Sequence, residues 1–150
     1  AGPWAKLAAG QGHGCGILAA SNTLACWGSD GYGQSTPPVG TFTDVSAGGN
    51  HSCAVASSGL AECWGADEYG QSTPPPGQFV AVAAGWIHSC GRRTDGTTEC
   101  WGQGASGQTA APQGGFAAVS TGGWFTCGVL AATQSLICWG QNTDGQSTPP

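Results

Sequence analysis

Residues 51–65 read HSCAVASSGLAECWG, and this stretch decides the fold because it contains two short strands and the turn between them. The turn Ser57-Ser58-Gly59 is a three-residue hairpin loop that has glycine where a positive φ is favoured. Pairing the flanking strands symmetrically places Cys53 directly opposite Cys63, with Cβ atoms about 4.5–5.5 Å apart. The strands expected on this basis are Ser52–Ala56 and Leu60–Trp64. The stretch therefore predicts a β-hairpin closed by a disulfide.

The same hairpin recurs along the whole chain. The eight cysteines alternate between a short spacing of 10 or 11 residues and a long spacing of 27 residues, which reveals a tandem repeat. Each unit opens on an aromatic residue, has Cys-Trp-Gly near its centre and ends on Gly-Gln followed by a tail that contains proline. The units, here called units 1 to 4, are Trp4–Thr41, Phe42–Gln78, Phe79–Gly115 and Phe116–Pro150, with residues 1–3 completing the last period. We expect one repeat array over residues 1–150, with all-β units of about 37 residues.

The cysteine spacing predicts four disulfides inside the units. Units 1 and 4 have one extra loop residue each, and their cysteines still face one another across the hairpin. The predicted pairs are Cys15–Cys26, Cys53–Cys63, Cys90–Cys100 and Cys127–Cys138. Zinc binding is disfavoured, because no C-x-x-C is present and each hairpin would bring only two thiols together. Disulfides indicate an oxidising compartment, so we expect a secreted, extracellular or cell-surface protein.

One unit carries a recognisable family pattern. Val-Ser-Ala-Gly-Gly-Asn-His-Ser-Cys-Ala-Val, residues 45–55, is followed by Cys-Trp-Gly at 63–65 and Tyr-Gly-Gln at 69–71. This order of elements resembles the regulator-of-chromosome-condensation repeat, in the short form of secreted bacterial propellers and plant receptors of the crinkly type. The resemblance covers all four units and implies a β-propeller of small blades, commonly seven, with loops that bind protein partners. It does not extend to nucleotide exchange or chromatin binding, because the required loops and basic segments have no counterpart here.

Four units leave the geometry of the array open. The chain is a window of a longer array, a four-bladed ring, or one of several copies stacked head to tail. The end of the sequence, QSTPP at 146–150, read together with AGPW at 1–4, matches QSTPP-VGTF at 34–42. Neither end has the polar cap that a repeat protein normally carries, which favours continuation over closure. The two architectures to be distinguished are propeller-like blades and an open β-repeat solenoid.

Composition excludes several functions. Charged residues are 7% of the chain and the formal net charge is −5, with 3 Lys and Arg residues, too few to neutralise a nucleic-acid backbone. No apolar run approaches the roughly 20 residues that span a membrane. No Gly-x-Ser-x-Gly elbow is present and all cysteines are assigned to pairs, so we expect no enzyme and no cofactor. His13, His51 and His88 share one register that Phe125 occupies in unit 4, which indicates packed histidines rather than metal or catalytic groups.

Aromatic residues provide the candidate binding sites. Trp27, Trp64, Trp101 and Trp139 follow the second cysteine of every unit, which indicates packing between units. Trp86 and Trp124 occur only in units 3 and 4, where they replace Gly49 and Asn50. We expect these two residues, with Tyr32 and Tyr69 in the loop before Gly-Gln, to contact a glycan or a protein partner.

The sequence also contains candidate glycosylation sites. Asn50-His51-Ser52 is an N-glycosylation sequon. The Ser-Thr-Pro-Pro segments resemble O-glycosylated sequences, with Thr36, Thr73 and Thr148 as candidates, although their prolines also suit an extended link between blades.

Two functions follow from these features. The first is a non-enzymatic, extracellular structural glycoprotein whose copies assemble head to tail into a filament or longer array. The scarcity of charge favours it, because a low-charge surface of Ser, Thr, Gln, Ala and Gly suits lateral packing. The second is a secreted β-propeller module that binds a protein or glycan. The partners expected are therefore other copies of the chain, a glycan or an extracellular protein, without nucleic acid and without a membrane span.

Overall fold

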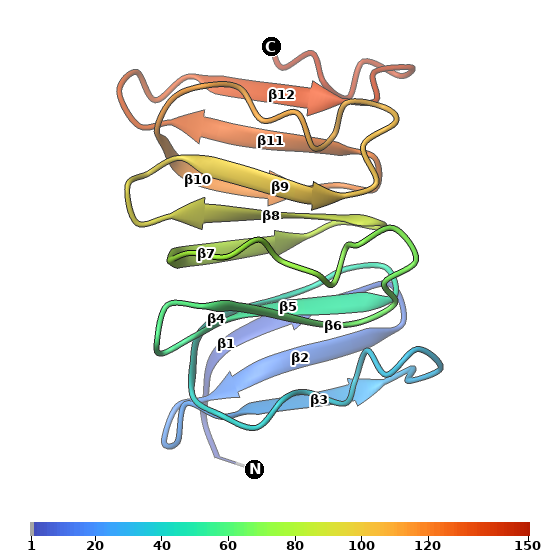
Figure 1. Cartoon of the computed structure of the whole chain (residues 1–150), viewed down its shortest axis with the longest axis vertical. Helices are drawn as coiled ribbons and strands as arrows, with labels where there is room; N and C mark the ends of the chain where they lie inside the picture. Colours follow the sequence, from blue (N-terminus) through green and yellow to red (C-terminus); the bar gives the residue numbers. More distant parts are fainter. Residues whose placement is uncertain (1) are drawn as a thin grey trace.

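The computed structural model describes residues 2–150, and its regular structure in this range consists of β-strands. Four antiparallel sheets each contain three consecutive strands, with the second strand in the centre. The strands are β1 (Trp4–Ala9), β2 (His13–Leu18), β3 (Leu24–Gly28), β4 (Phe42–Ala47), β5 (His51–Ala56), β6 (Ala61–Gly65), β7 (Phe79–Ala84), β8 (His88–Arg93), β9 (Thr98–Gly102), β10 (Phe116–Thr121), β11 (Phe125–Leu130) and β12 (Leu136–Gly140). The sheets follow one another along the longest axis of the molecule, from β1–β3 at one end to β10–β12 at the other (Figure 1). The all-β prediction is confirmed.

The hairpins have the predicted cysteine register. Cys53 pairs with Cys63 across β5 and β6, and the other three cysteine pairs lie opposite one another in the same way. All four predicted disulfides form, so each central strand is covalently joined to its third strand. Gly59 and Gly96 have φ values of +88°, as the short loop requires. The predicted strand bounds are wrong by one residue at three ends: β5 begins at His51, and β6 runs from Ala61 to Gly65, while the Leu60 carbonyl accepts from the Ala56 amide and closes the loop.

Apolar side chains form the core between neighbouring sheets. Between units 2 and 3, Cys53 and Val55 on β5 pack against Phe79, Val82 and Trp101 of the next unit. The Phe79 and Trp101 rings lie 6.0 Å apart, centroid to centroid. The opening phenylalanines of units 2 to 4 are each 1% exposed. Units 2 to 4 therefore use their Phe and Trp to cover the face of the preceding unit, which stabilises the row of sheets through hydrophobic burial.

A backbone carbonyl links each unit to the next one. The Trp64 Nε1–H donates to the Gln34 carbonyl over 2.9 Å, and the Ser52 hydroxyl donates to the same oxygen over 3.1 Å. The same pair of bonds reaches the Gln71 carbonyl from unit 3 and the Gln108 carbonyl from unit 4. The acceptor is a main-chain atom, and the buried side chain of the same glutamine supports this loop by accepting from the amide two residues before it.

The three histidines form the second polar link between units. Nε2 of His13, His51 and His88 lies 2.7–2.9 Å from the hydroxyl of the next unit's Ser52, Ser89 or Thr126. Each hydroxyl proton is directed to a Gln carbonyl, so the histidine Nε2–H must be the donor in this contact. Nδ1 is then an unprotonated acceptor, and in all three histidines it is buried without a partner. Burial lowers the pKa of His51 and of His88 to about 4, so both are neutral at pH 7.

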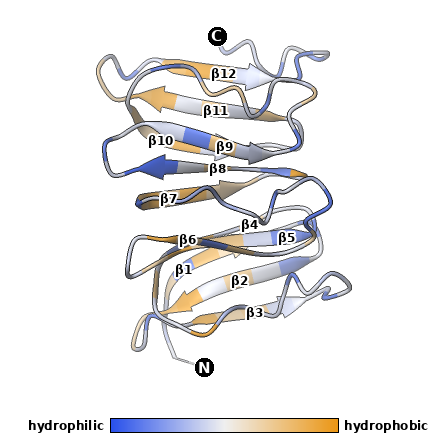
Figure 2. Cartoon of the chain, viewed as in Figure 1, coloured by the Kyte–Doolittle hydropathy of each residue, from blue (hydrophilic) through white to orange (hydrophobic). Residues whose placement is uncertain are grey.

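The first unit departs from the predicted burial of the tryptophans. Trp101 and Trp139 are each 8% exposed, whereas Trp27 is 50% exposed, because no sheet of the described chain precedes unit 1. Trp4 and Leu7 on β1 are also exposed, although the Trp4 and Trp27 rings lie 5.7 Å apart, centroid to centroid, as the Phe79 and Trp101 rings do at 6.0 Å. Figure 2 shows apolar colour on β1 and again on β11 and β12 at the opposite end of the molecule. The prediction that all four tryptophans are packed between units is therefore wrong for Trp27.

Candidate functional site

The first strands of the four sheets line one common surface, here called the inner face. It consists of residues 7–9, 45–47, 82–84 and 119–121, which together surround a hollow of about 340 Å³. Cross-links between adjacent first strands shape this face: Asp44 Oδ2 accepts from the Val82 amide over 2.9 Å, and Ser46 Oγ accepts from the Ala84 amide over 3.0 Å. Side chains of one sheet thus satisfy the exposed backbone edge of the next sheet.

The turns that join first and second strands form the second candidate surface, here called the turn face. It comprises residues 10–12, 48–50, 85–87 and 122–124, and the loops after the third strands begin beside these turns. Glycine is required at 48 and 85, because a Cβ on Gly48 would lie 2.2 Å from the Gly85 carbonyl oxygen and a Cβ on Gly85 would lie 2.6 Å from the Gly122 carbonyl oxygen. The turns therefore approach one another more closely than residues with side chains allow.

The structure brings Trp86 and Trp124 together on the turn face. Their rings meet edge to face, with centroids 6.4 Å apart, and Trp86 is 47% exposed. Gly49 packs against Trp86, where a Cβ would lie 3.0 Å from the indole ring, and both residues line a groove of about 250 Å³. An exposed aromatic ring beside a shallow groove can stack on an apolar ligand face.

Tyr32 and Tyr69 do not join this pair. They are exposed in separate loops after β3 and β6, where each tyrosine amide donates to the side chain of Gln34 or Gln71. The structure thus places the four predicted aromatic contacts in three places.

The acidic residues of these loops support the loops themselves. Asp67 Oδ1 accepts from the Ser72 amide and Oδ2 from the Thr73 hydroxyl, each over 2.7 Å. Asp30 makes the same bonds with Ser35 and Thr36, and these bonds hold the pKa of Asp30 below its ordinary value. Within residues 2–150, no three His, Cys, Asp or Glu side chains gather in a way that could hold a metal ion.

The candidate glycosylation residues are all at the surface. Asn50, Thr36, Thr73 and Thr148 are exposed, and the three threonine hydroxyls bond to Asp30, Asp67 and Asn142. Attachment of glycans at these residues stays a prediction.

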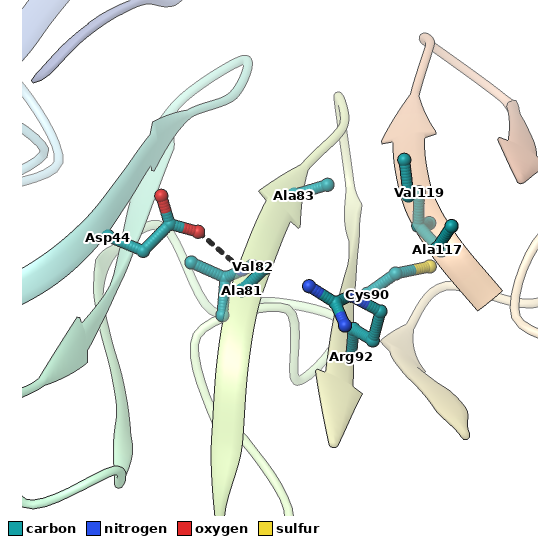
Figure 3. A pocket seen from close by; sticks show the side chains of 9 residues that line it. Asp44, Ala81, Val82, Ala83, Cys90, Arg92, Ala117 and Val119 are labelled. Atoms are coloured by element: carbon teal, nitrogen blue, oxygen red, sulfur yellow. Dashed lines mark hydrogen bonds between the residues drawn. The ribbon is translucent and has the colours of Figure 1, made fainter. Parts of the chain in front are cut away.

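The interface between units 3 and 4 contains a cavity of about 280 Å³ that the sequence analysis did not anticipate (Figure 3). Arg92 enters it from β8, Ala81 and Ala83 line it from β7, and Ala117 and Ala118 line it from β10. The signal was present in the repeat: Arg92 occupies the register of Ile17 and Val55, which are 2% and 1% exposed. Unit 3 therefore has a guanidinium at a position where units 1 and 2 have a buried apolar side chain.

The fold and these surfaces define a class: an array of propeller blades, each a small antiparallel sheet that packs face to face on its neighbour. The family described as "Regulator of chromosome condensation (RCC1) repeat" matches residues 42–71 and 116–146, which lie in units 2 and 4. Units 2 and 4 thus contain repeats similar to this type, as the sequence pattern predicted, and units 1 and 3 have the same three-stranded sheet. Within residues 2–150, no helix is long and apolar enough to cross a membrane.

Solved structures show the same likeness over nearly the whole chain. The CRINKLY WD40 ectodomain of the Arabidopsis thaliana receptor kinase ACR4 is 33% identical, with a TM-score of 0.77 over 93% of this chain and 50% of that one. The ectodomain of the Physcomitrella patens receptor kinase CR4 is 31% identical, with a TM-score of 0.78 over 93% of this chain and 39% of that one.

A more distant match shares the fold alone. Yeast RCC1 (Prp20), in a structure with bound Kap60, is 15% identical, with a TM-score of 0.78 over 93% of this chain and 44% of that one. The chain thus spans about half the length of these proteins or less.

Proposed function

We propose that the chain is an extracellular, non-enzymatic structural module whose copies assemble head to tail, with unit 4 of one copy against unit 1 of the next. The observation that carries the proposal is the uncovered face of unit 1. Trp4 and Trp27 occupy the registers of Phe79 and Trp101, which cover the preceding sheet elsewhere in the chain. A second copy would supply a sheet for them to cover.

The opposite end offers a matching surface. Cys127, Val129 and Leu136 line an apolar hollow of about 130 Å³ on unit 4, together with Ala118, Val119, Ser120 and Gly128. Cys127 and Val129 stand in the registers of Cys53 and Val55, which receive Phe79 and Trp101 in the interface between units 2 and 3. The Gln146 carbonyl is the counterpart of the carbonyls that accept from Trp64, Trp101 and Trp139.

The unit-specific substitutions also fit this contact. Inside the chain, a histidine of one unit meets a Ser or Thr hydroxyl of the next unit. At the proposed contact, Phe125 of unit 4 occupies the histidine position and Gly14 of unit 1 occupies the Ser or Thr position. The larger phenylalanine ring would therefore face a residue that has no side chain. A contact of this kind is heterologous, and it yields a ring or a filament according to the rotation between copies.

The proposal is tested by sedimentation and by electron microscopy of the chain at increasing concentration. We expect assemblies whose number grows with concentration, and a Trp27→Glu variant that stays monomeric because it places a charge in the apolar contact. Trp86→Glu is the matched control, since Trp86 is exposed on the turn face and should leave assembly unchanged. A wild-type chain that stays monomeric at every concentration would overturn the proposal.

An extracellular location is part of the same proposal. It is supported by the four disulfides, which persist in oxidising compartments, and by the likeness to two plant receptor ectodomains.

A second candidate function is recognition of a protein or glycan by the turn face. The contact between Trp86 and Trp124 beside a groove favours it, and the structurally similar yeast RCC1 was solved with a protein bound. A binding screen against glycans and extracellular proteins tests it: a bound ligand should be lost in Trp86→Ala and retained in Trp27→Ala. The reverse pattern would place the ligand on unit 1 instead.

A further inference from the structure

We propose that the cavity between units 3 and 4 binds a small carboxylate with an apolar body, held by the Arg92 guanidinium and the Val119 amide. This cavity lies between units 3 and 4 of one chain and Arg92 does not line the faces that would meet in head-to-tail assembly, whereas Val119 lines both this cavity and the hollow on unit 4. The cavity measures about 280 Å³ and its walls are mainly alanine and valine side chains (Figure 3).

The neighbouring interface shows how the chain holds a carboxylate at this register. Between units 2 and 3, the Asp44 carboxylate accepts from the Val82 amide over 2.9 Å and from Lys6 Nζ over 2.7 Å. One backbone amide and one cation thus compensate the charge. The Asp44 carboxylate thus shows how a ligand carboxylate would be held at the equivalent position between units 3 and 4.

The interface between units 3 and 4 has a backbone amide and a cation, as the preceding interface does, but it has no counterpart of the Asp44 carboxylate. Ala81 stands in the register of Asp44, so no carboxylate enters from β7. Val119 lies opposite Gly128 as Val82 lies opposite Gly91, so its amide also points away from its partner strand. In residues 2–150 no side chain accepts from this amide. An amide next to a cavity can donate to a ligand without any rearrangement of the sheet.

Arg92 supplies the positive charge. The other two cations of the chain are engaged: Lys6 bonds Asp44, and Arg93 bonds Glu99 and lies 4.6 Å from the centre of the Phe79 ring. The guanidinium of Arg92 has no hydrogen-bond or ion-pair partner within the described range, although it stands at a core position. Asp44 also lines the cavity, but its carboxylate is compensated by Lys6 and Val82. An unpaired guanidinium between apolar walls selects an anion that carries an apolar group.

The cavity size sets the kind of ligand. A carboxylate alone would leave most of the volume empty, while the alanine side chains offer no further polar contacts. A hexanoate or benzoate ion places its charge at Arg92 and its carbon atoms against the alanines. The C-terminal carboxylate of a peptide that ends in a large apolar residue has the same chemistry.

Titration of the chain with hexanoate, followed by amide and arginine nitrogen NMR, tests the proposal. We expect saturable shifts at the Val119 amide and the Arg92 side chain, and no saturable shift with hexanamide, which has the same shape without the charge. A peptide ending in phenylalanine and its C-terminal amide form the second arm. Tighter binding of the peptide acid than of hexanoate would identify a chain terminus as the ligand, and tighter binding of hexanoate would identify a free acid.

Two variants copy residues that sister units already use, so the fold should be retained. Arg92→Val installs the residue of unit 2 and should weaken hexanoate binding by about tenfold or more. Ala81→Asp installs the acid of unit 2, should fill the site and should abolish binding. Glu99→Gln is the control, because it changes a charge near Arg93 without touching the cavity. Equal binding of hexanamide, unchanged binding by Arg92→Val, or no saturable shift at all would overturn the proposal.

Discussion

Mild acid should destabilise this fold through His51 and His88. Both rings are fully buried, and their pKa values are about 4 in the folded chain because burial disfavours the charged form. In the unfolded chain a histidine has a pKa of about 6.5, so the unfolded state binds more protons between pH 6.5 and pH 4. Their contribution to stability is complete above pH 6.5 and is lost as the pH falls toward 4.

The magnitude follows from the linkage relation. Between pH 7 and pH 5 each histidine loses about 2 kcal/mol, so the pair loses about 4 kcal/mol. His13 acts in the same direction, because burial also lowers its pKa. The contact geometry explains the penalty: a proton added to Nδ1 would lie in the core beside a glycine, without an acceptor. The lowered pKa of Asp30 and of Asp95 matters only below pH 4, so this range isolates the histidines.

Urea unfolding at pH 7, 6 and 5 measures the effect, with the disulfides intact. The control is His51→Gln combined with His88→Gln, whose amides can donate to Ser89 and Thr126 and do not titrate. This variant should start less stable and should lose about 4 kcal/mol less than wild type over the same range. If the double variant fails to fold, His51→Gln alone should remove half of the dependence. Equal pH dependence in wild type and variant would refute the reasoning.

Three further predictions concern the disulfides, the glycine turns and the loops of the fold. Thiol titration of the unfolded, unreduced chain should find no free cysteine, and Cys53→Ala with Cys63→Ala should cost about 2–3 kcal/mol in urea unfolding, because one short loop is no longer closed. Gly48→Ala should cost about 1–3 kcal/mol through the clash with the Gly85 carbonyl, whereas Gly31→Ala, with no atom within 4 Å, should change the unfolding midpoint little. Asp67→Ala should remove two bonds at about 1 kcal/mol each and speed proteolysis of residues 66–78, while Glu68→Ala should leave the cleavage rate unchanged.

The repeat was readable in the sequence because its strongest signals are local. Cys53 and Cys63 lie ten residues apart on one hairpin, so turn length alone sets their register. The packing of Trp101 was also predictable, since a residue that recurs in every unit must serve every interface. The exposure of Trp27 could not be predicted from the repeat, because it depends on whether another sheet precedes unit 1.

The cavity between units 3 and 4 can be recognised only when the units are compared with one another in the folded chain. Arg92 is unremarkable as a surface cation until the fold places it in the register of Ile17 and Val55. The loss of Asp44's counterpart at Ala81 becomes visible only when the first strands of successive sheets are known to lie side by side. The sequence was sufficient to predict the residues that all units share and to single out Trp86 and Trp124, but it did not show that Arg92 and Ala81 line one cavity.

The carbonyls of Gln34, Gln71 and Gln108 have a consequence for how such a chain can lengthen. Each accepts both a Trp Nε1–H and a hydroxyl from the following unit, and a main-chain oxygen is present whatever side chain the residue bears. A duplicated unit would bring its own donors and find an acceptor already in place, so an in-frame gene duplication needs no compensating mutation at this joint. Variation is then free to accumulate at positions such as Arg92 and Trp86, where one copy can acquire a role that its siblings lack.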